Sequence, residues 1–185
     1  ANSTVFGGIA GDAMAAWVPR AGAFVEPDAT AIEAARARAE HPFAAPERDL
    51  NGLRIKLIDG MWENAGILRD RAGLERAAAM LDGLGEALSR TGIGDGPRAF
   101  NLAWHDWLNL ESQIQASRAI VGAALAREDS RGAHYREDFP EPGDLESSYF
   151  TRARLIEGEV TVATQAVEFT RVRPGESLIP QEGAA

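Results

Sequence analysis

The chain has 185 residues, of which 45% are hydrophobic and 25% are charged, as is typical of one soluble globular domain with or without an appendage. Its formal net charge of −9 argues against a nucleic-acid partner, because no basic stripe is available to neutralise phosphates. The absence of cysteine excludes thiol catalysis, disulfide bonds and cysteine-ligated metal sites within the chain.

The first residues favour a helix with unusually small side chains that runs to Val18, with Ser3 or Thr4 as its N-cap. The stretch is too short to span a membrane and has Asp12 in its middle, so neither a signal peptide nor a transmembrane helix is expected. Glycine and alanine let a helix lie close to another backbone. Residues 1–27 are therefore interpreted as a helix and linker that belong against another domain.

Residues 28–128 have the apolar periodicity of a helical domain. A short helix is expected to start after Asp28 and to run to about Glu40, with Pro42 ending it. Longer helices follow, with apolar residues recurring every three or four positions. These residues are Leu50, Leu53, Leu57, Ile58, Met61 and Trp62; then Leu74, Ala77, Leu81, Leu84 and Leu88; then Trp107, Leu110, Ile114, Val121 and Ala124. Such seams predict a mainly α fold, an antiparallel bundle of about three long helices.

Residues 129–185 begin with a polar loop, after which the hydrophobic period changes from helical to two. Residues 149–155 and 160–169 alternate apolar and polar side chains, and Glu157-Gly158 between them predicts the turn of a small C-terminal β-hairpin extension. The last residues, from Pro174 onward, are expected to form a loose tail.

Two patterns that suggest chemistry have simpler interpretations. The sequence GIGDGP at residues 92–97 follows a helix rather than a strand, so it is interpreted as a linker and not as a dinucleotide-binding loop. His41, His105 and His134 have no metal-ligand spacing on a helix, so no metal site is predicted.

Aromatic rings and carboxylates are the remaining candidates. Trp62, Trp104 and Trp107 could line a ligand pocket, although aromatic residues at helical spacing usually belong to a core. The carboxylates around the polar loop are not arranged like a paired acid and base, and no nucleophile or cofactor motif lies near them. They are Glu128, Asp129, Glu137 and Asp138. No catalytic residue is assigned.

Residues 125–140, LAREDSRGAHYREDFP, resemble a segment near the end of succinate dehydrogenase and fumarate reductase flavoproteins and their relatives, L-aspartate oxidase included. The matching residues are Ala126, Arg127, Ser130, Arg131, Gly132, Ala133, His134, Arg136, Asp138, Phe139 and Pro140. A second stretch, MWENAGILRDRAGLERAAAMLDGL, resembles the same family through Met61, Trp62, Gly66, Ile67, Arg69 and Leu74. The opening VFGGIAGD resembles the family's helix after its flavin-binding stretch.

The resemblance implies the C-terminal helical domain of an FAD-dependent oxidoreductase that acts on a dicarboxylate or related acid. In this family the dinucleotide-binding glycines and the dicarboxylate-binding residues lie upstream, in what we call the flavin-binding part of a longer parent. The family places its flavin-contacting serine seven positions before the phenylalanine of Val-Phe-Gly, whereas Ser3 is three before Phe6. Asn2 and Ser3 are thus expected to lie past the flavin. FAD is expected in the full-length parent and none in this fragment, which should be inactive alone.

The polar loop is then interpreted as a docking surface formed by Arg131, His134, Arg136 and Asp138. Its expected partners are the FAD-binding domain and an iron–sulfur subunit, because family members often dock such a protein. Without these partners, the cations are expected to be solvated or paired with neighbouring carboxylates, and to gain their charge-assisted bonds only in the parent.

The resemblance also implies a cytoplasmic location, or one at the inner face of the membrane through partner subunits. The alternative hypothesis is a free-standing helical interaction module with no redox parent.

Overall fold

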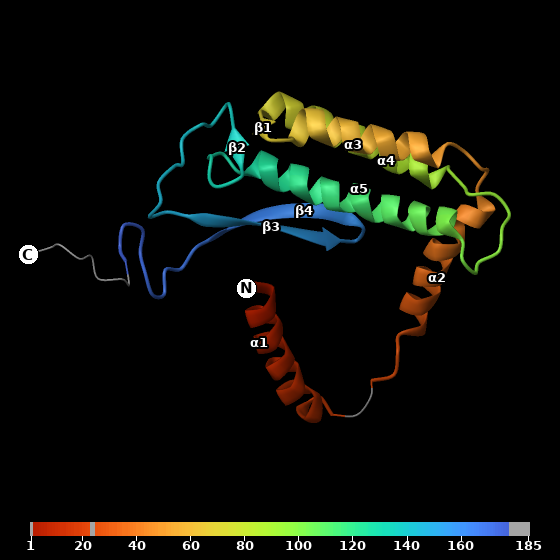
Figure 1. The fold of residues 1–185 in the computed structure, drawn as a ribbon, viewed down its shortest axis with the longest axis horizontal. Coiled ribbons are helices and arrows are strands. Elements are labelled where there is room, and N and C mark those ends of the chain that lie inside the picture. Colours follow the sequence, from red (N-terminus) through yellow and green to blue (C-terminus); the bar gives the residue numbers. More distant parts are fainter. Residues whose placement is uncertain (1, 23–24, 178–185) are drawn as a thin grey trace, which may run out of the picture. The chain divides into compact units, whose positions relative to one another are not determined.

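The structure is a computed structural model that describes residues 2–22 and 25–177 (Figure 1). The chain falls into two compact units, Ala1–Arg38 and Ala39–Ala185, and the division lies inside a helix. Among the described residues, no helix combines the length and the apolar content needed to cross a membrane. Most of the predicted tail after Pro174 lies outside the described residues.

The first unit contains helix α1, Asn2–Trp17, and a 3-10 turn, Val18–Arg20. The predicted N-cap is wrong, because α1 already includes Ser3 and Thr4, and a cap residue must precede the first helical residue. Every side chain from Ser3 to Trp17 is exposed.

Helix α2, Ala29–Ala44, is held at its start by Asp28, whose carboxylate accepts a hydrogen bond from the backbone N–H of Thr30 at 2.9 Å. The prediction that Pro42 ends this helix is wrong, since the helix continues for two more residues. Proline removes one donor without forcing an end. Here Pro42 is buried, and its carbonyl accepts a hydrogen bond from the N–H of Ile93 at 3.0 Å, which holds the turn in place.

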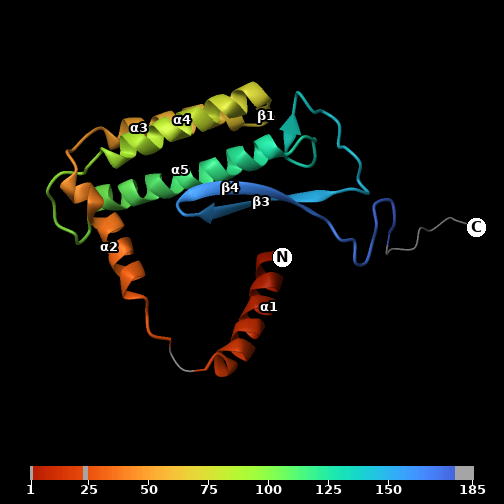
Figure 2. The same cartoon turned by 180° about the vertical axis from the view of Figure 1, so that it is seen from behind.

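Three further helices pack side by side: α3, Leu50–Ala65; α4, Arg71–Ser89; and α5, Leu102–Ala126 (Figures 1 and 2). Each begins after a polar side chain that accepts a hydrogen bond from the backbone N–H three residues later. Such caps satisfy one of the unpaired donors of a helix N-terminus. The three capping residues are Asp49, Asp70 and Asn101.

The core lies between these helices. All predicted seam positions of α4 and α5 are buried, namely Leu74, Ala77, Leu81, Leu84, Leu88, Trp107, Leu110, Ile114, Val121 and Ala124. Helix α3 buries less of its apolar stripe than predicted. Leu57 is buried, but Ile58 is exposed and Trp62 is 70% exposed. The apolar stripe on α3 is therefore wider than the face of the helix that packs against the core.

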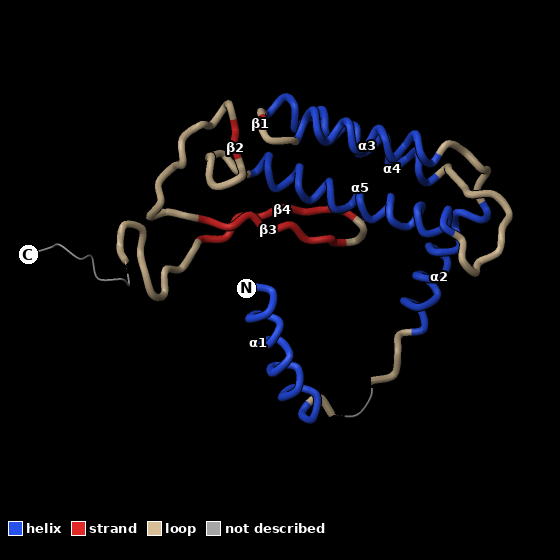
Figure 3. The backbone as a smooth tube through the Cα atoms, viewed as in Figure 1, coloured by secondary structure: helices blue, strands red, loops and turns tan. Residues whose placement is uncertain are grey.

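The predicted β-hairpin is confirmed as β3, Tyr149–Ile156, paired antiparallel with β4, Glu159–Ala166 (Figure 3). Both residues of the connecting turn, Glu157 and Gly158, have positive φ, as a two-residue turn that matches the strand twist requires. The hairpin packs along α5, and Gly122 of α5 allows a close approach of Val162 from β4. A Cβ added to Gly122 would be 3.0 Å from Val162 Cγ2.

A second, very short sheet joins distant parts of the sequence. Strand β1, Leu68–Arg69, follows α3 and pairs in parallel with β2, Tyr135–Arg136, in the polar loop. The N–H of Glu137 donates to the carbonyl of Arg69 at 2.8 Å and extends the pairing. The pairing brings the polar loop to the end of the helices, near the start of α4 and the end of α5.

Candidate functional site

Arg136 lies at the C-terminal end of α5 and is completely buried. Its Nη1 donates to the carbonyl oxygens of Ala124 at 2.8 Å and Arg127 at 3.2 Å. The first carbonyl belongs to the last turn of α5 and the second to its C-cap residue. At this end the helix acceptors have no partner within the helix and the helix dipole is negative. The guanidinium therefore satisfies and neutralises the end of α5.

Asp138 connects the same guanidinium to the next helix. Its carboxylate accepts two hydrogen bonds from Arg136, from Nε and from Nη2, each at 2.7 Å. It also accepts one from the backbone N–H of Arg71, the first residue of α4, at 3.0 Å. The bonds from Arg136 are the main cause that lowers the pKa of Asp138 to about 2. We call this pair the Arg136–Asp138 clamp, because it joins the end of α5 to the start of α4.

His134 is held as a neutral ring beside Arg69. Nη1 of Arg69 lies 3.0 Å from Nδ1 of His134, and Nε of Arg69 donates to the carbonyl of Gly66 at 2.7 Å. Since a guanidinium has only donors, Nδ1 must accept and the ring proton must be on Nε2. Burial is the main cause that lowers the pKa of His134. A hydrogen bond with the backbone of Arg127 raises this pKa, and the charges of Arg69 and two other arginines lower it further.

Arg131 closes the loop on itself. Its Nε donates to the carbonyl of Pro142 at 2.6 Å, Nη1 to Ser148 Oγ at 2.6 Å, and Nη2 to the carbonyl of Asp144 at 3.0 Å. The expected local pairing with neighbouring carboxylates is present, because Arg136 pairs with Asp138 and Arg131 lies 3.6 Å from Asp129. The expectation that charge-assisted bonds form only in the parent is wrong for Arg136, which is fully buried in this chain. Both arginines have partners inside this chain, because the loop folds back onto helix ends and its own carbonyls.

Arg69 and Arg71 are members of this cluster that the sequence did not indicate. Arg69 stands in a stretch that resembles the family, but its contact with His134 spans 65 positions. The bond from Arg71 to Asp138 spans 67 positions. No local pattern signals contacts at such separations.

The other candidate side chains do not form a common site. Trp107 is in the core and donates to the carbonyl of Thr91 at 2.7 Å, and Trp104 packs edge-on against Phe43 with ring centres 5.1 Å apart. Trp62 faces solvent on α3. The three rings are thus used separately, two in packing and one at the surface.

The histidines and the glycine-rich stretch have structural partners. Nε2 of His41 lies 2.8 Å from the carbonyl of Ser89, and residues 92–97 connect α4 to α5. Within residues 2–22 and 25–177, no group of three histidines or carboxylates is placed to hold a metal ion.

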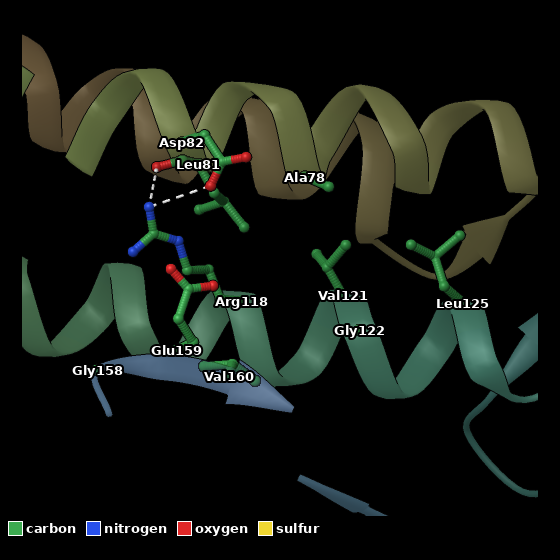
Figure 4. Close-up of a pocket in the computed structure, with 10 residues that line it drawn as sticks. All are labelled: Ala78, Leu81, Asp82, Arg118, Val121, Gly122, Leu125, Gly158, Glu159 and Val160. Atoms are coloured by element: carbon green, nitrogen blue, oxygen red, sulfur yellow. Dashed lines mark hydrogen bonds and ion pairs between the residues drawn. The ribbon is translucent and has the colours of Figure 1, made fainter. Parts of the chain in front are cut away.

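A cavity of about 250 Å³ lies between α4, α5 and the hairpin turn (Figure 4). Its aliphatic lining includes Leu81 and Val121, and its charged side chains are Asp82, Arg118 and Glu159. Figure 4 shows Arg118 reaching across to α4, where Nη2 donates to Asp82 Oδ1 at 3.2 Å and to the carbonyl of Leu81 at 3.3 Å. These lining residues include no serine, threonine or histidine, and Arg118 joins α5 to α4 across the cavity.

Comparisons with known proteins agree with the resemblance noted in the sequence. A family model described as fumarate reductase flavoprotein C-term matches residues 54–180. A fumarate reductase flavoprotein subunit of Mycobacterium tuberculosis is 32% identical over 188 residues, which cover 94% of this chain and 31% of that protein. This chain therefore spans about a third of the length of that relative.

Solved structures share the fold. The quinol fumarate reductase of E. coli matches 82% of this chain and 27% of its own, with a TM-score of 0.72 and 24% identity. The adenylylsulfate reductase of Archaeoglobus fulgidus matches 91% of this chain and 29% of its own, with a TM-score of 0.74 and 20% identity. At these identities the likeness shows the fold alone, and the same fold occurs in proteins named for different substrates.

Proposed function

The chain belongs to the family of fumarate reductase flavoprotein C-terminal domains, and from this premise we propose that it is the C-terminal helical domain of an FAD-dependent oxidoreductase of the succinate dehydrogenase/fumarate reductase type. In this proposal α3, α4 and α5 form the bundle of the domain. FAD and a dicarboxylate substrate bind elsewhere in the parent, and this domain supports and docks against the flavin-binding part.

The observation that carries the proposal is the buried Arg136 in the segment most similar to the family. In an active site for a dicarboxylate, arginines would have donors open to a ligand. Here the donors of Arg136 are directed at the end of α5 and at Asp138, which accepts in turn from the first residue of α4. The cations of this segment thus hold the domain in shape, and a docking role of Arg131, His134, Arg136 and Asp138 is an indirect one, exerted through the surface that they fix.

Partners and location follow from the same premise. We infer that the parent assembles with an iron–sulfur subunit that removes or delivers electrons, and that it works in the cytoplasm or at the inner face of the membrane through its partner subunits. The name of the E. coli protein, a quinol fumarate reductase, supports the redox class of the parent by analogy of fold only.

The test compares the parent with the 185-residue chain. The purified parent should show flavin absorbance and should oxidise succinate or reduce fumarate with artificial electron carriers. The chain alone should be colourless and inactive, because it has no phosphate-cradling glycine loop after a strand. Stoichiometric flavin in the chain would refute the proposal, and a parent without flavin would favour the free-standing interaction module instead.

A further inference from the structure

The connection between α4 and α5 exposes an aromatic ring from a strained backbone. Phe100 is 100% exposed and has φ of 58°, in the left-handed region that non-glycine residues rarely adopt. Among the described residues, Glu157 is the other non-glycine with positive φ, and its hairpin turn requires it. Phe100 is not in a hairpin turn, and its ring is left exposed by the fold. Backbone strain of this kind persists where the surroundings impose it.

The next residue imposes it. Asn101 Oδ1 accepts a hydrogen bond from the N–H of Trp104 at 3.0 Å and so caps α5, while Nδ2 donates to the carbonyl of Pro97 at 2.9 Å. The two bonds close residues 97–101 into a turn with Phe100 on its outside. Leu102, the first residue of α5, is 77% exposed beside it.

The inner side of this turn is fastened to the domain. Arg98 Nε donates to Glu40 at 3.1 Å, and its guanidinium lies 4.3 Å from the centre of the Phe43 ring. Trp104 Nε1 donates to the carbonyl of Ala39 at 2.7 Å. Residues 39–43 are where the polypeptide enters the helical unit from upstream. The turn is therefore rigid, and it lies at the point of entry.

We propose that Phe100, with Leu102 beside it, is the anchor that binds this domain to an apolar pocket on the flavin-binding part of its own parent polypeptide. This inference rests on the proposed function. A rigid, preformed aromatic anchor loses little conformational entropy when it is buried, and such residues supply much of the energy of an interface.

Connectivity selects the upstream polypeptide over a separate protein. The flavin-binding part is joined to the helical unit through residues 1–38, which enter it at residues that the turn itself contacts. Because the two parts belong to one molecule, the effective concentration of the pocket at Phe100 does not depend on the concentration of a second protein. The curated relative also has about two thirds of its length outside the match to this chain, which leaves room for a separate pocket-bearing part.

The first experiment is hydroxyl-radical footprinting of the Phe100 ring in the flavin-loaded parent and in the 185-residue chain. The ring should be labelled strongly in the chain and should lose its labelling in the parent. Equal labelling in a parent that retains FAD would overturn the anchor and leave the proposed function intact. Protection that appears only when a separate iron–sulfur protein is added would also overturn it, because the occupant would be another chain. A parent without FAD would refute the proposed function and the anchor together.

Variants at Phe100 separate docking from strain. In the parent, Phe100→Ala and Phe100→Gly should speed the loss of FAD on dilution, whereas Phe100→Tyr should retain FAD as the native parent does. The control is Ile120→Ala, at a 51% exposed position on α5, which should leave FAD retention unchanged. In the 185-residue chain, Phe100→Gly should instead raise the melting temperature, because glycine adopts positive φ without strain. Unchanged FAD retention in both Phe100→Ala and Phe100→Gly parents would refute the anchor.

Discussion

Two loops of this domain orient their side chains in opposite ways. The loop of residues 129–148 is rich in charge, yet it directs Arg136 into the protein and Arg131 onto its own backbone. The connection of residues 92–101 is less charged, yet it directs Phe100 into solvent. The difference teaches that composition does not set the direction of a loop side chain. In the first loop, Arg136 turns inward because the end of α5 offers it unpaired carbonyls. In the second, the bonds of Asn101 hold a turn that leaves Phe100 outside.

The largest expected effect comes from removing the clamp. Arg136→Ala should lower the free energy of unfolding by about 3–5 kcal/mol, because it leaves the carbonyls at the end of α5 and the Asp138 carboxylate without their partner. Urea unfolding of the 185-residue chain measures this loss. Arg152→Ala is the matched control, since Arg152 is exposed and donates to the exposed Gln165, and it should cost almost nothing. If the two substitutions lowered the free energy of unfolding equally, the clamp would contribute no more than an exposed surface pair, and the prediction would be wrong.

A substitution in the core gives the scale for the clamp. Leu81→Ala should destabilise the domain by about 2–5 kcal/mol, because Leu81 is fully buried between α4 and its neighbours and its loss opens a cavity. Thermal or urea unfolding measures the change. An unchanged melting temperature would contradict the assignment of Leu81 to the core seam.

The pH dependence of stability isolates the carboxylate side of the clamp. The pKa of Asp138 is about 2 in the folded protein, below its ordinary value of 3.8, so the unfolded chain binds the proton more readily. The stabilisation is therefore complete above about pH 4 and is lost as the pH falls toward 2. Unfolding free energies over this window should fall less steeply for Asp138→Asn than for the native chain, and parallel slopes would contradict the clamp.

The smallest effect is expected at Arg131. Its acceptors are carbonyls and a hydroxyl in a partly exposed loop, and its contact with Asp129, at 3.6 Å, is long. Arg131→Ala should cost about 1 kcal/mol or less, as for other partly exposed polar bonds. If Arg131→Ala lowered the free energy of unfolding as much as Arg136→Ala in the same urea series, Arg131 would be as important to the fold as the clamp, and the comparison would fail.

Periodic sequence predicted most of the regular structure. The seams of α4 and α5 were recognisable because each buries one face along its whole length, and the hairpin because Glu157-Gly158 suits a tight turn. The exposure of Ile58 and Trp62 was not recognisable, because hydrophobicity alone does not tell how much of an apolar face finds a neighbour.

The candidate site was predictable only in part. The resemblance drew attention to Arg131, His134, Arg136 and Asp138, but the local sequence does not contain the ends of α4 and α5 that Asp138 and Arg136 satisfy, or the Arg69 side chain beside His134. The burial of Arg136 follows from the end of α5, and the neutral ring of His134 follows from Arg69. A charged motif after a helix is therefore as compatible with closing that helix as with meeting a partner.

The order of the clamp in the chain has a consequence for synthesis on the ribosome. Helices α4 and α5 are complete at Ala126, but the groups that close their ends come ten and twelve residues later, at Arg136 and Asp138. A nascent chain that has not yet emerged to Asp138 has its helices in place with open ends, and a chain truncated before it never closes them. The clamp bonds can therefore form only after the polar loop has left the exit tunnel, later in translation than the helices that they join.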